Sequence, residues 1–403
     1  MAEKAVIIGA GHAGGILAQQ LSRAGDAFEI TLVGEEAWPP YERPPLSKQL
    51  LMGEIPTEKT FLRPADFYEK KNIGLRLGVR ATTIDRAART VALSDGSSLP
   101  YDRLALCTGA QLRRLNIPGS DLKGIHYIRA IDDTLAILEE AGEGAKVVVI
   151  GGGYIGLEAA AALTKAGCRV KVIEMLDRVM ARAVAEPLSR FYEEQHRARG
   201  VEILLNTGVA SFEGDGRVSA VIDAGGGRHE CDLAIVGIGV IQDVALAEQA
   251  GLQIDGGIVV DALARTSDPL ISAAGDCTDH PNAILGRRLR LESVQNAVDQ
   301  ARCIANDWQG KGAEYAEVPW FWSDQFDLKL QMAGLPEPDD EFLVRGEMTM
   351  DGFSVFYMRG GKVTGVNALN QGSDYVRGRK WIAEGRVVDP KRLADTSIPI
   401  KEV

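Results

Sequence analysis

Residues 147–167 read VVVIGGGYIGLEAAAALTKAG, and residues 5–18, AVIIGAGHAGGILA, follow the same plan. In both stretches an apolar, β-branched run is followed by glycines at GxGxxG spacing and then by a helical pattern; the glycines are Gly9, Gly11 and Gly14, then Gly151, Gly153 and Gly156. The glycines permit a tight turn, close approach of the backbone to a pyrophosphate, and close packing of helix on strand. Unpaired amides at the helix N-terminus favour the negative charge of that pyrophosphate. The sequence therefore predicts an α/β protein with two Rossmann-like dinucleotide-binding domains.

An acidic residue completes each of the two units. The run EITLVGEE reaches Glu35, and CRVKVIEMLDR reaches Glu174. A carboxylate at the end of the second strand accepts hydrogen bonds from the ribose hydroxyls of an adenosine. The motif alone does not separate NAD from FAD. A chain with two such units binds two dinucleotides, and the economical reason is electron transfer between a nicotinamide and a flavin.

Composition narrows the functional classes. The net charge of −11 argues against non-specific binding to nucleic acid or to an anionic membrane. No run approaches the roughly 18 apolar residues of a membrane helix. The five cysteines form no CxxC pair and the five histidines show no metal-ligand spacing, so we expect no disulfide framework, no metal site and a cytoplasmic protein.

Several motifs, in a fixed order, resemble those of one family. They are the first glycine-rich unit, PYERPPLSK, LALCTGA, the second glycine-rich unit and LISAAGDCTDH, followed by RLESVQNAVDQAR and VPWFWSDQFDLKLQMAGL. The chain resembles the FAD-dependent pyridine-nucleotide reductases from about Ala5 to about Lys401. Within them it is similar to the putidaredoxin reductase-like ferredoxin reductases, which serve cytochromes P450 and ring-hydroxylating oxygenases.

The resemblance assigns cofactor-binding roles to residues of this sequence. For a tightly bound FAD it implies Gly9, Gly11, Ala13, Gly14, Glu35, Arg43, Lys48, Ala81, Arg129, Asp276 and Val294. For NADH it implies Gly151, Gly153, Tyr154, Ile155, Gly156, Glu174, Arg182, Gly237 and Gly239. The match at Ala81 is looser than the others.

Three residues are implied in the reaction itself. In relatives, the glutamate of GYIGLE pairs with the lysine of PPLSK against the flavin, which here gives Glu158 and Lys48. A cation held beside the flavin stabilises the negative charge that hydride transfer creates. A glutamate in the first turn of a helix is also compatible with a solvated position favoured by the helix dipole. Trp322, in PWFWSDQ, is expected at the exposed edge of the flavin, although a place in the core of the C-terminal domain is an alternative.

Two departures from the family pattern stand out. Cys107 occupies a position that is usually alanine, where a small buried thiol fits. The segment VGIGVIQDVALA lacks the usual Pro-Asn after its turn, so the loop at 241–243 is expected to differ.

The order of the motifs predicts the domain layout. An FAD-binding domain covers 1–113 and resumes at 244–318, with an NAD-binding domain at 114–243 between its two parts. The residues from 319 to 403 alternate apolar and polar positions around Arg359-Gly360-Gly361-Lys362 and end in a helical pattern. They predict a small C-terminal α+β domain of antiparallel strands.

The thiols of other branches are missing. Disulfide reductases need a redox pair near the flavin, and the loop that carries a single cysteine in NADH oxidases reads Pro44-Pro45-Leu46-Ser47-Lys48 here. Electrons must therefore pass directly to an external carrier. The resemblance implies a two-iron two-sulfur ferredoxin, which feeds an oxygenase or a cytochrome P450. Rubredoxin reductase, monodehydroascorbate reductase and a signalling protein like apoptosis-inducing factor are the alternatives, and both a monomer and a homodimer remain open.

Overall fold

The computed structural model describes residues 2–403, and contacts between residues divide the chain into two units. The first unit contains the residues up to Arg43, Glu58–Gln111 and Val240–Phe321. The second contains Pro44–Thr57, Leu112–Gly239 and Trp322–Val403. The domain limits at 113/114, 243/244 and 318/319 stay a prediction, and each unit is described by itself below.

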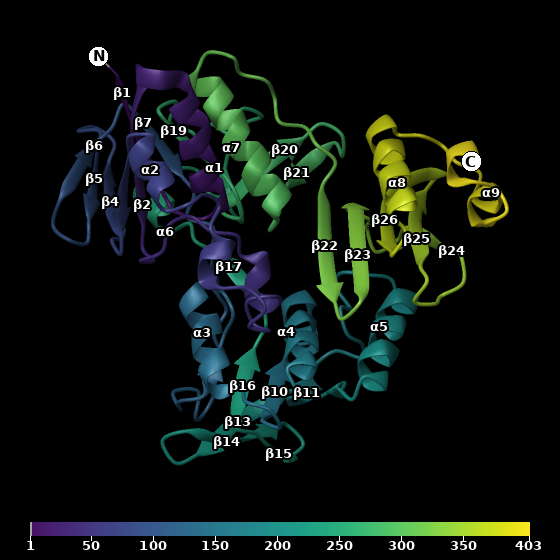
Figure 1. Ribbon diagram of the computed structural model, residues 1–403. Helices are drawn as coiled ribbons and strands as arrows, with labels where there is room; N and C mark the ends of the chain where they lie inside the picture. The colour runs from purple at the N-terminus through teal and green to yellow at the C-terminus, as the bar shows by residue number, and fades with distance from the viewer. Residues whose placement is uncertain (1) are drawn as a thin grey trace. The chain divides into compact units, whose positions relative to one another are not determined.

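A parallel five-stranded sheet forms the centre of the first unit, in the strand order β19-β7-β1-β2-β3 (Figure 1). The strands are β1 (Glu3–Ile8), β2 (Phe28–Gly34), β3 (Ile73–Leu77), β7 (Arg103–Leu106) and β19 (Ile271–Ala273). Helices α1 (His12–Leu21) and α7 (Val294–Trp308) pack against each other. Both lie on one face of this sheet, together with the short α2 (Asp66–Lys70).

The alternation of side chains along β1 builds two cores in this unit. Ala5 and Ile7 are buried among α1 and α7, whereas Val6 and Ile8 pack against a second, antiparallel sheet. Successive residues of a strand point to opposite faces, so a continuous apolar run is what a strand buried on both sides requires. The second sheet consists of β4 (Ala81–Asp85), β5 (Thr90–Leu93) and β6 (Ser98–Pro100).

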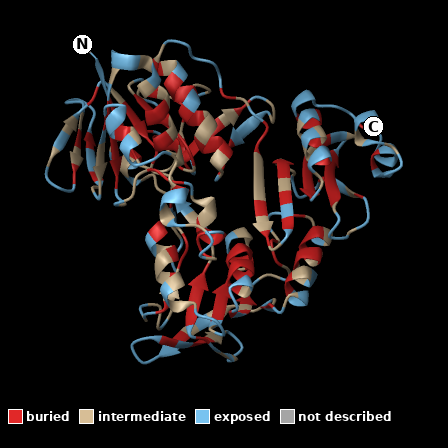
Figure 2. Ribbon diagram, in the orientation of Figure 1, coloured by how far each residue is buried: buried red, intermediate tan, exposed pale blue. Residues whose placement is uncertain are grey.

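The second unit contains another parallel sheet, in the order β12-β11-β10-β16-β9. Its strands are β9 (Ile125–His126), β10 (Lys146–Ile150), β11 (Arg169–Ile173), β12 (Glu202–Leu204) and β16 (Leu233–Val236). Helix α4 (Tyr154–Lys165) packs on β10 and β11. Val148 and Ile150 pack with residues of a three-stranded antiparallel sheet, formed by β13 (Val209–Gly214), β14 (Val218–Asp223) and β15 (Arg228–Glu230). Figure 2 shows the apolar strands of both parallel sheets as buried.

The C-terminal part of the second unit is an antiparallel sheet of order β22-β23-β26-β25-β24, with α8 packed on it. Its elements are β22 (Trp320–Gln325), β23 (Leu328–Gly334), β24 (Glu341–Arg345), β25 (Phe353–Arg359), β26 (Lys362–Leu369) and α8 (Gly372–Glu384). The predicted antiparallel strands and closing helix are confirmed here. Helix α5 (Glu186–Ala198) reaches this sheet, because the Phe191 and Phe353 rings lie 5.1 Å apart edge to face.

The remaining elements are short. They are η1 (Ser22–Ala27), η2 (Pro44–Ser47), η3 (Thr57–Thr60), β8 (Ala110–Leu112), α3 (Ile131–Glu140), β17 (Val240–Gln242), α6 (Ala245–Gln249), β18 (Ile258–Val259), β20 (Thr278–Asn282), β21 (Arg287–Leu289), α9 (Pro390–Ala394) and η4 (Ile400–Glu402). The segment at 241–243 lies at the end of β17, where the Asp243 carbonyl accepts a hydrogen bond from Thr108 Oγ1 at 2.6 Å. None of the helices formed by residues 2–403 is long and apolar enough to span a membrane.

Candidate functional site

The first glycine-rich turn, between β1 and α1, leaves no room for side chains except at its open end. A Cβ at Gly9 would lie 2.1 Å from the Cys107 carbonyl oxygen, and one at Gly14 would lie 1.9 Å from the Gly9 carbonyl oxygen. A Cβ at Gly11, the N-cap of α1, would meet nothing within 4 Å among the described residues, and no described side chain caps the helix there. Open space at an uncapped helix N-terminus fits the pyrophosphate of a dinucleotide.

The other residues predicted for FAD in the first unit are placed as follows. Ala13 is buried in α1, Ala81 is buried at the start of β4, Asp276 follows β19, and Val294 begins α7. Glu35 is exposed at the end of β2, with its carboxylate 3.6 Å from the Arg80 guanidinium.

Arg43 is held by an acidic residue, Glu36, for which no role was predicted. Its guanidinium lies 2.8 Å from Glu36 Oε1, and the Tyr41 hydroxyl donates to Glu36 Oε2 at 2.5 Å. The same guanidinium lies 5.2 Å from the centre of the Tyr41 ring. Glu36 therefore orients Arg43. Its adjacency to Glu35 was the only sequence signal, and that signal does not say which of the two acids turns toward Arg43.

The second glycine-rich turn, between β10 and α4, repeats this construction. A Cβ at Gly151 would lie 2.4 Å from the Gly237 carbonyl oxygen, and one at Gly156 would lie 2.0 Å from the Gly151 carbonyl oxygen. At Gly153, the N-cap of α4, the described residues leave more than 4 Å of open space, as they do at Gly239. The same test therefore gives a second site that fits a dinucleotide.

Side chains around the second turn differ in their exposure and contacts. Ile155 is exposed in the first turn of α4, whereas the neighbouring Tyr154 hydroxyl contacts Met332 Sδ at 2.9 Å. Arg129, which was predicted to contact FAD, lies in the second unit, and its backbone N–H donates to Asp133 Oδ2 at 2.9 Å.

Both oxygens of Glu174 are tied to backbone amides. Oε2 accepts from Gly152 N at 2.6 Å and Oε1 accepts from Leu176 N at 2.8 Å. Arg178 is also used internally, since it donates to the carbonyls of Val184 and Ala181 at 3.0 and 2.9 Å. Arg182, which was predicted to bind NADH, is exposed in the same loop.

The predicted ion pair between Lys48 and Glu158 is present. Among the ion pairs that lysines form in the second unit, it is the most buried. Lys48 Nζ lies 2.5 Å from Glu158 Oε2, and the two side chains are 10% and 2% exposed. Two serines add donors: Ser47 Oγ to Glu158 Oε2 at 2.6 Å, and Ser323 Oγ to Glu158 Oε1 at 2.7 Å. Breaking a buried ion pair on one side costs several kcal/mol because a buried charge is left uncompensated, so this carboxylate needs all three donors.

The loop that carries Lys48 is built to hold it in place. Two prolines open the 3₁₀ turn η2, and Thr134 Oγ1 of α3 donates to the Leu46 carbonyl at 3.0 Å. Lys48 N donates to the Pro45 carbonyl at 3.0 Å. The lysine is thus presented by a rigid turn that belongs to the same unit as Glu158.

The serines around Glu158 were not predicted from the sequence. Ser323 lies on β22 next to the half-buried Trp322, and it is completely buried, as is Gln325 two positions further along. A signal was present: WFWSDQ ends in three polar residues, two of which, Ser323 and Gln325, share one face of a strand that begins with aromatic residues.

The cysteines are buried free thiols at all five positions. Burial raises the pKa of the Cys107 thiol well above its ordinary value, so this thiol is neutral and unreactive. Within residues 2–403 no cluster of three or more histidine, cysteine and acidic residues could hold a metal ion.

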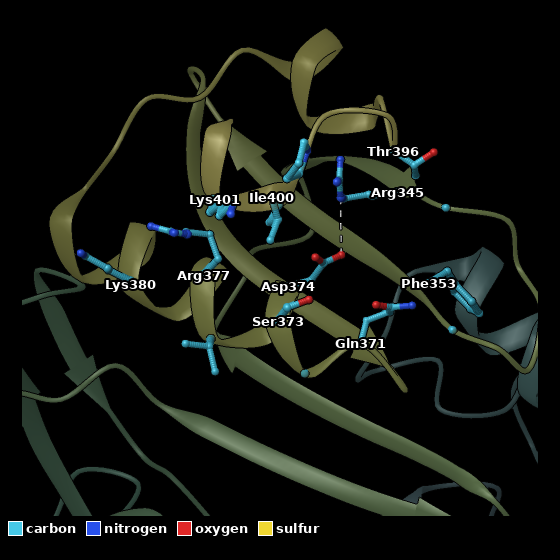
Figure 3. A pocket seen from close by; sticks show the side chains of 15 residues that line it. Arg345, Phe353, Gln371, Ser373, Asp374, Arg377, Lys380, Thr396, Ile400 and Lys401 are labelled. Atoms are coloured by element: carbon cyan, nitrogen blue, oxygen red, sulfur yellow. Dashed lines mark ion pairs between the residues drawn. The ribbon is translucent and has the colours of Figure 1, made fainter.

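A cavity of about 1000 Å³ lies in the C-terminal part of the second unit (Figure 3). The buried Arg345 on its wall lies 3.6 Å from Asp374 and donates to three backbone carbonyls, those of Leu393, Asp395 and Ile398. This arginine therefore fixes the end of the chain. The other cationic residues that line the cavity are Arg377, Lys380 and Lys401.

Comparison with known proteins matches almost the whole chain. Residues 3–301 match the pyridine nucleotide-disulphide oxidoreductase profile, and residues 320–403 match the reductase C-terminal profile. The chain is 44% identical to a ferredoxin–NAD(P)⁺ reductase of a Sphingomonas species over 98% of this chain and 96% of that protein. It is 41% identical to putidaredoxin reductase of Pseudomonas putida over 100% of this chain and 96% of that protein.

A solved structure resembles the chain equally closely. The crystal structure of the covalent putidaredoxin reductase–putidaredoxin complex contains a chain that is 41% identical, with a TM-score of 0.96. The match covers 100% of this chain and 98% of that one.

Proposed function

Because the chain belongs to the pyridine nucleotide-disulphide oxidoreductase family, we propose that it takes electrons from NADH and delivers them to a two-iron two-sulfur ferredoxin that serves an oxygenase or a cytochrome P450. The chain is an oxidoreductase that uses FAD and NAD(P)H, and it is a ferredoxin reductase of oxygenase systems. The choice of NADH and the type of iron–sulfur cluster are the proposed parts. The match of residues 320–403 to the reductase C-terminal profile supports this assignment.

The proposal also assigns FAD to the first glycine-rich turn and NADH to the second. Gly9, Gly11 and Gly14, with Ala13, would hold the FAD pyrophosphate at the N-terminus of α1, and Glu35 would hold its ribose. Gly151, Gly153 and Gly156 would hold NADH at the N-terminus of α4. When bound, the flavin supplies a two-electron acceptor that can release electrons one at a time.

The observation that carries the mechanism is the buried pair of Lys48 and Glu158. A fixed cation in a site closed to water stabilises developing negative charge far better than a mobile one in solvent. Glu158 keeps the ammonium of Lys48 in place, and Ser47 and Ser323 keep Glu158 in place. The role of these residues is electrostatic, because neither needs to exchange a proton for electrons to pass.

Replacement of Lys48 tests this role. In Lys48→Met we expect the limiting rate of flavin reduction by NADH to fall about 100-fold, which corresponds to about 2.7 kcal/mol. The concentration of NADH at half-saturation should change less than threefold, because Lys48 does not lie in the second glycine-rich turn. Anaerobic stopped-flow absorbance at saturating NADH measures both quantities.

Lys59→Met is the matched control, since Lys59 is an exposed lysine from the same stretch of chain. We expect it to react at the wild-type rate. A wild-type rate in Lys48→Met would show that Lys48 serves packing alone. The proposed electron acceptor is tested in the same instrument by mixing the NADH-reduced protein with a two-iron two-sulfur ferredoxin and following reduction of the ferredoxin.

A cytoplasmic location is part of the proposal. All five cysteines are free thiols in the structure, which supports a reducing compartment.

A further inference from the structure

A row of buried polar side chains continues from Glu158 into the body of the second unit. Ser323, Gln325 and His196 are all 0% exposed. Gln325 Nε2 lies 3.2 Å from Ser323 Oγ, and Gln325 Oε1 lies 2.9 Å from His196 Nε2. Ser323 and Gln325 come from β22 and His196 comes from α5, so residues from two distant parts of the chain meet here.

Because the Glu158 carboxylate can only accept hydrogen bonds, it fixes the direction of every hydrogen bond in this row. Glu158 is a carboxylate that only accepts, so the Ser323 hydroxyl must donate to it. The Ser323 oxygen then accepts from the amide NH₂ of Gln325, whose second hydrogen points to Met180 Sδ at 3.9 Å. The Gln325 carbonyl oxygen is left to accept, which requires His196 to carry its proton on Nε2.

Other contacts of His196 agree with this orientation. Within residues 2–403 its Nδ1 atom has no hydrogen-bond partner, as expected for the unprotonated ring nitrogen. Burial lowers the pKa of His196 to about 4, so the ring is neutral at physiological pH. Its ring packs edge to face on Phe326, with centroids 5.0 Å apart.

We propose that His196, Gln325 and Ser323 form a one-directional hydrogen-bond chain that positions Glu158 and, through it, Lys48 for electron transfer. The inference rests on the proposed role of Lys48. All three bonds point their hydrogens toward the carboxylate, and aligned hydrogen bonds polarise one another in an interior of low dielectric. The three residues are positioning residues, since they act through Glu158 and touch no substrate.

Strand β22 therefore has two separate tasks on its two faces. Ser323 and Gln325 point to Glu158 and His196, and Trp322 and Asp324, which alternate with them, are half-buried on the other face. The C-terminal region thus supplies part of the support of the ion pair, as well as the tryptophan predicted at the flavin edge.

A pair of variants of equal shape isolates the hydroxyl of Ser323. Ser323→Thr keeps the donor, whereas Ser323→Val has the same volume and lacks it. We expect the limiting rate of flavin reduction by NADH to be about 10-fold lower in Ser323→Val than in Ser323→Thr, with the same half-saturating NADH concentration in both. Equal rates in two variants that both retain FAD would overturn the proposal.

A double-mutant cycle tests whether Ser323 acts through Glu158. In a Glu158→Gln background the valine and threonine variants should differ less than twofold, because the carboxylate that Ser323 serves is gone. A difference that persists at 10-fold would show that Ser323 acts by another route. If Ser323→Val does not fold, Gln325→Met provides the same comparison one step further along the chain, with an expected reduction of about threefold against wild type.

Nuclear magnetic resonance of the oxidised holoenzyme gives a test that does not depend on activity. With ¹⁵N-labelled histidine we expect His196 to be the Nε2–H tautomer, with a slowly exchanging Nε2 proton that is lost or exchanges rapidly in Gln325→Met. Observation of the Nδ1–H tautomer would overturn the proposed direction of the chain.

The two proposals fail in different ways. A wild-type rate in Lys48→Met would contradict the proposed function of the ion pair. A slow Lys48→Met enzyme combined with equal Ser323→Thr and Ser323→Val rates would leave that function standing and overturn the positioning chain alone.

Discussion

At the scale of single residues, we propose that Glu174 favours NADH over NADPH. Both of its oxygens are fixed by the amides of Gly152 and Leu176, so this negative charge cannot move away from an incoming 2′-phosphate. We expect kcat/KM for NADPH to be at least 10-fold lower than for NADH, which corresponds to about 1.4 kcal/mol or more. Steady-state kinetics with the two coenzymes measures the ratio, and equal values would contradict the role of Glu174.

Substitutions at two glycines of the first turn, Gly14 and Gly11, should distinguish an effect on folding from an effect on FAD binding. Gly14→Ala places a Cβ 1.9 Å from the Gly9 carbonyl oxygen, so we expect failure to fold or destabilisation by about 3 kcal/mol. Gly11→Ala meets open space and an extended backbone with φ of −87°, so the apoprotein should melt as wild type does. Its affinity for FAD should nevertheless fall about 10-fold, because the methyl group occupies the place of the pyrophosphate.

Thermal melting of the apoproteins and titration with FAD measure the two effects. Wild-type affinity for FAD in Gly11→Ala would show that the pyrophosphate does not approach this turn.

At the scale of elements, Arg345 fixes the C-terminal segment to β24. Its planar guanidinium serves three carbonyls of the segment from Leu393 to Ile398 while it faces Asp374, a geometry that an ammonium cannot reproduce. Arg345→Met and Arg345→Lys should both weaken the attachment of this segment. We expect the free energy of its local unfolding to fall by about 3 kcal/mol in Arg345→Met and by somewhat less in Arg345→Lys.

Limited proteolysis followed by mass spectrometry should then show early cleavage between α8 and the C-terminus in both variants. Arg392→Lys is the control, because Arg392 is an exposed arginine that donates to a single carbonyl, that of Glu402. Full protection of Arg345→Lys would mean that the positive charge alone holds the segment.

The elements also show how far sequence reasoning reaches. The two glycine-rich turns were predictable because GxGxxG, the preceding strand and the terminal acid are all local features. The pairing of Lys48 with Glu158 was predictable only from a resemblance, since 110 residues separate them. The positions of Ser323, Gln325 and His196 were not, because a serine in a strand and a histidine in an amphipathic helix have many ordinary roles. Only the contact between β22 and α5 in the folded chain joins the three residues, because Gln325 bonds to both Ser323 and His196.

At the scale of the whole molecule, net charge governs the approach of the partner. The charge of −11 repels an acidic ferredoxin, so local basic residues must guide the encounter. In the stretch GRRLRLES, residues 286–293, Arg288 is already bound to Asp279 at 2.6 Å and to the carbonyls of Val260 and Asp279, so it is a poor candidate for this role. Arg290 is exposed and pairs with the equally exposed Glu292 at 2.9 Å, so it is the better candidate there.

We expect Arg290→Glu to raise the KM for ferredoxin about fivefold and to flatten its dependence on salt, while ferricyanide reduction stays at the wild-type rate. Arg302→Glu is the control, because Arg302 is an exposed arginine with a comparable partner, Asp299 at 3.3 Å. Steady-state assays at several salt concentrations measure the effect. A parallel loss of both activities in Arg290→Glu would assign this arginine to flavin binding or to structure.

The division of the chain between the two units has a consequence for synthesis on the ribosome. The first unit takes its last segment from Val240–Phe321, and the second takes its last segment from Trp322–Val403. Neither unit can therefore be completed when its first half emerges: the first closes only after about four fifths of the residues have left the exit tunnel, and the second also needs the residues that follow. Until Ser323 appears, Glu158 and Lys48 are two charges without their full set of partners. The ion pair therefore gains its full set of hydrogen bonds only after β22 has been synthesised.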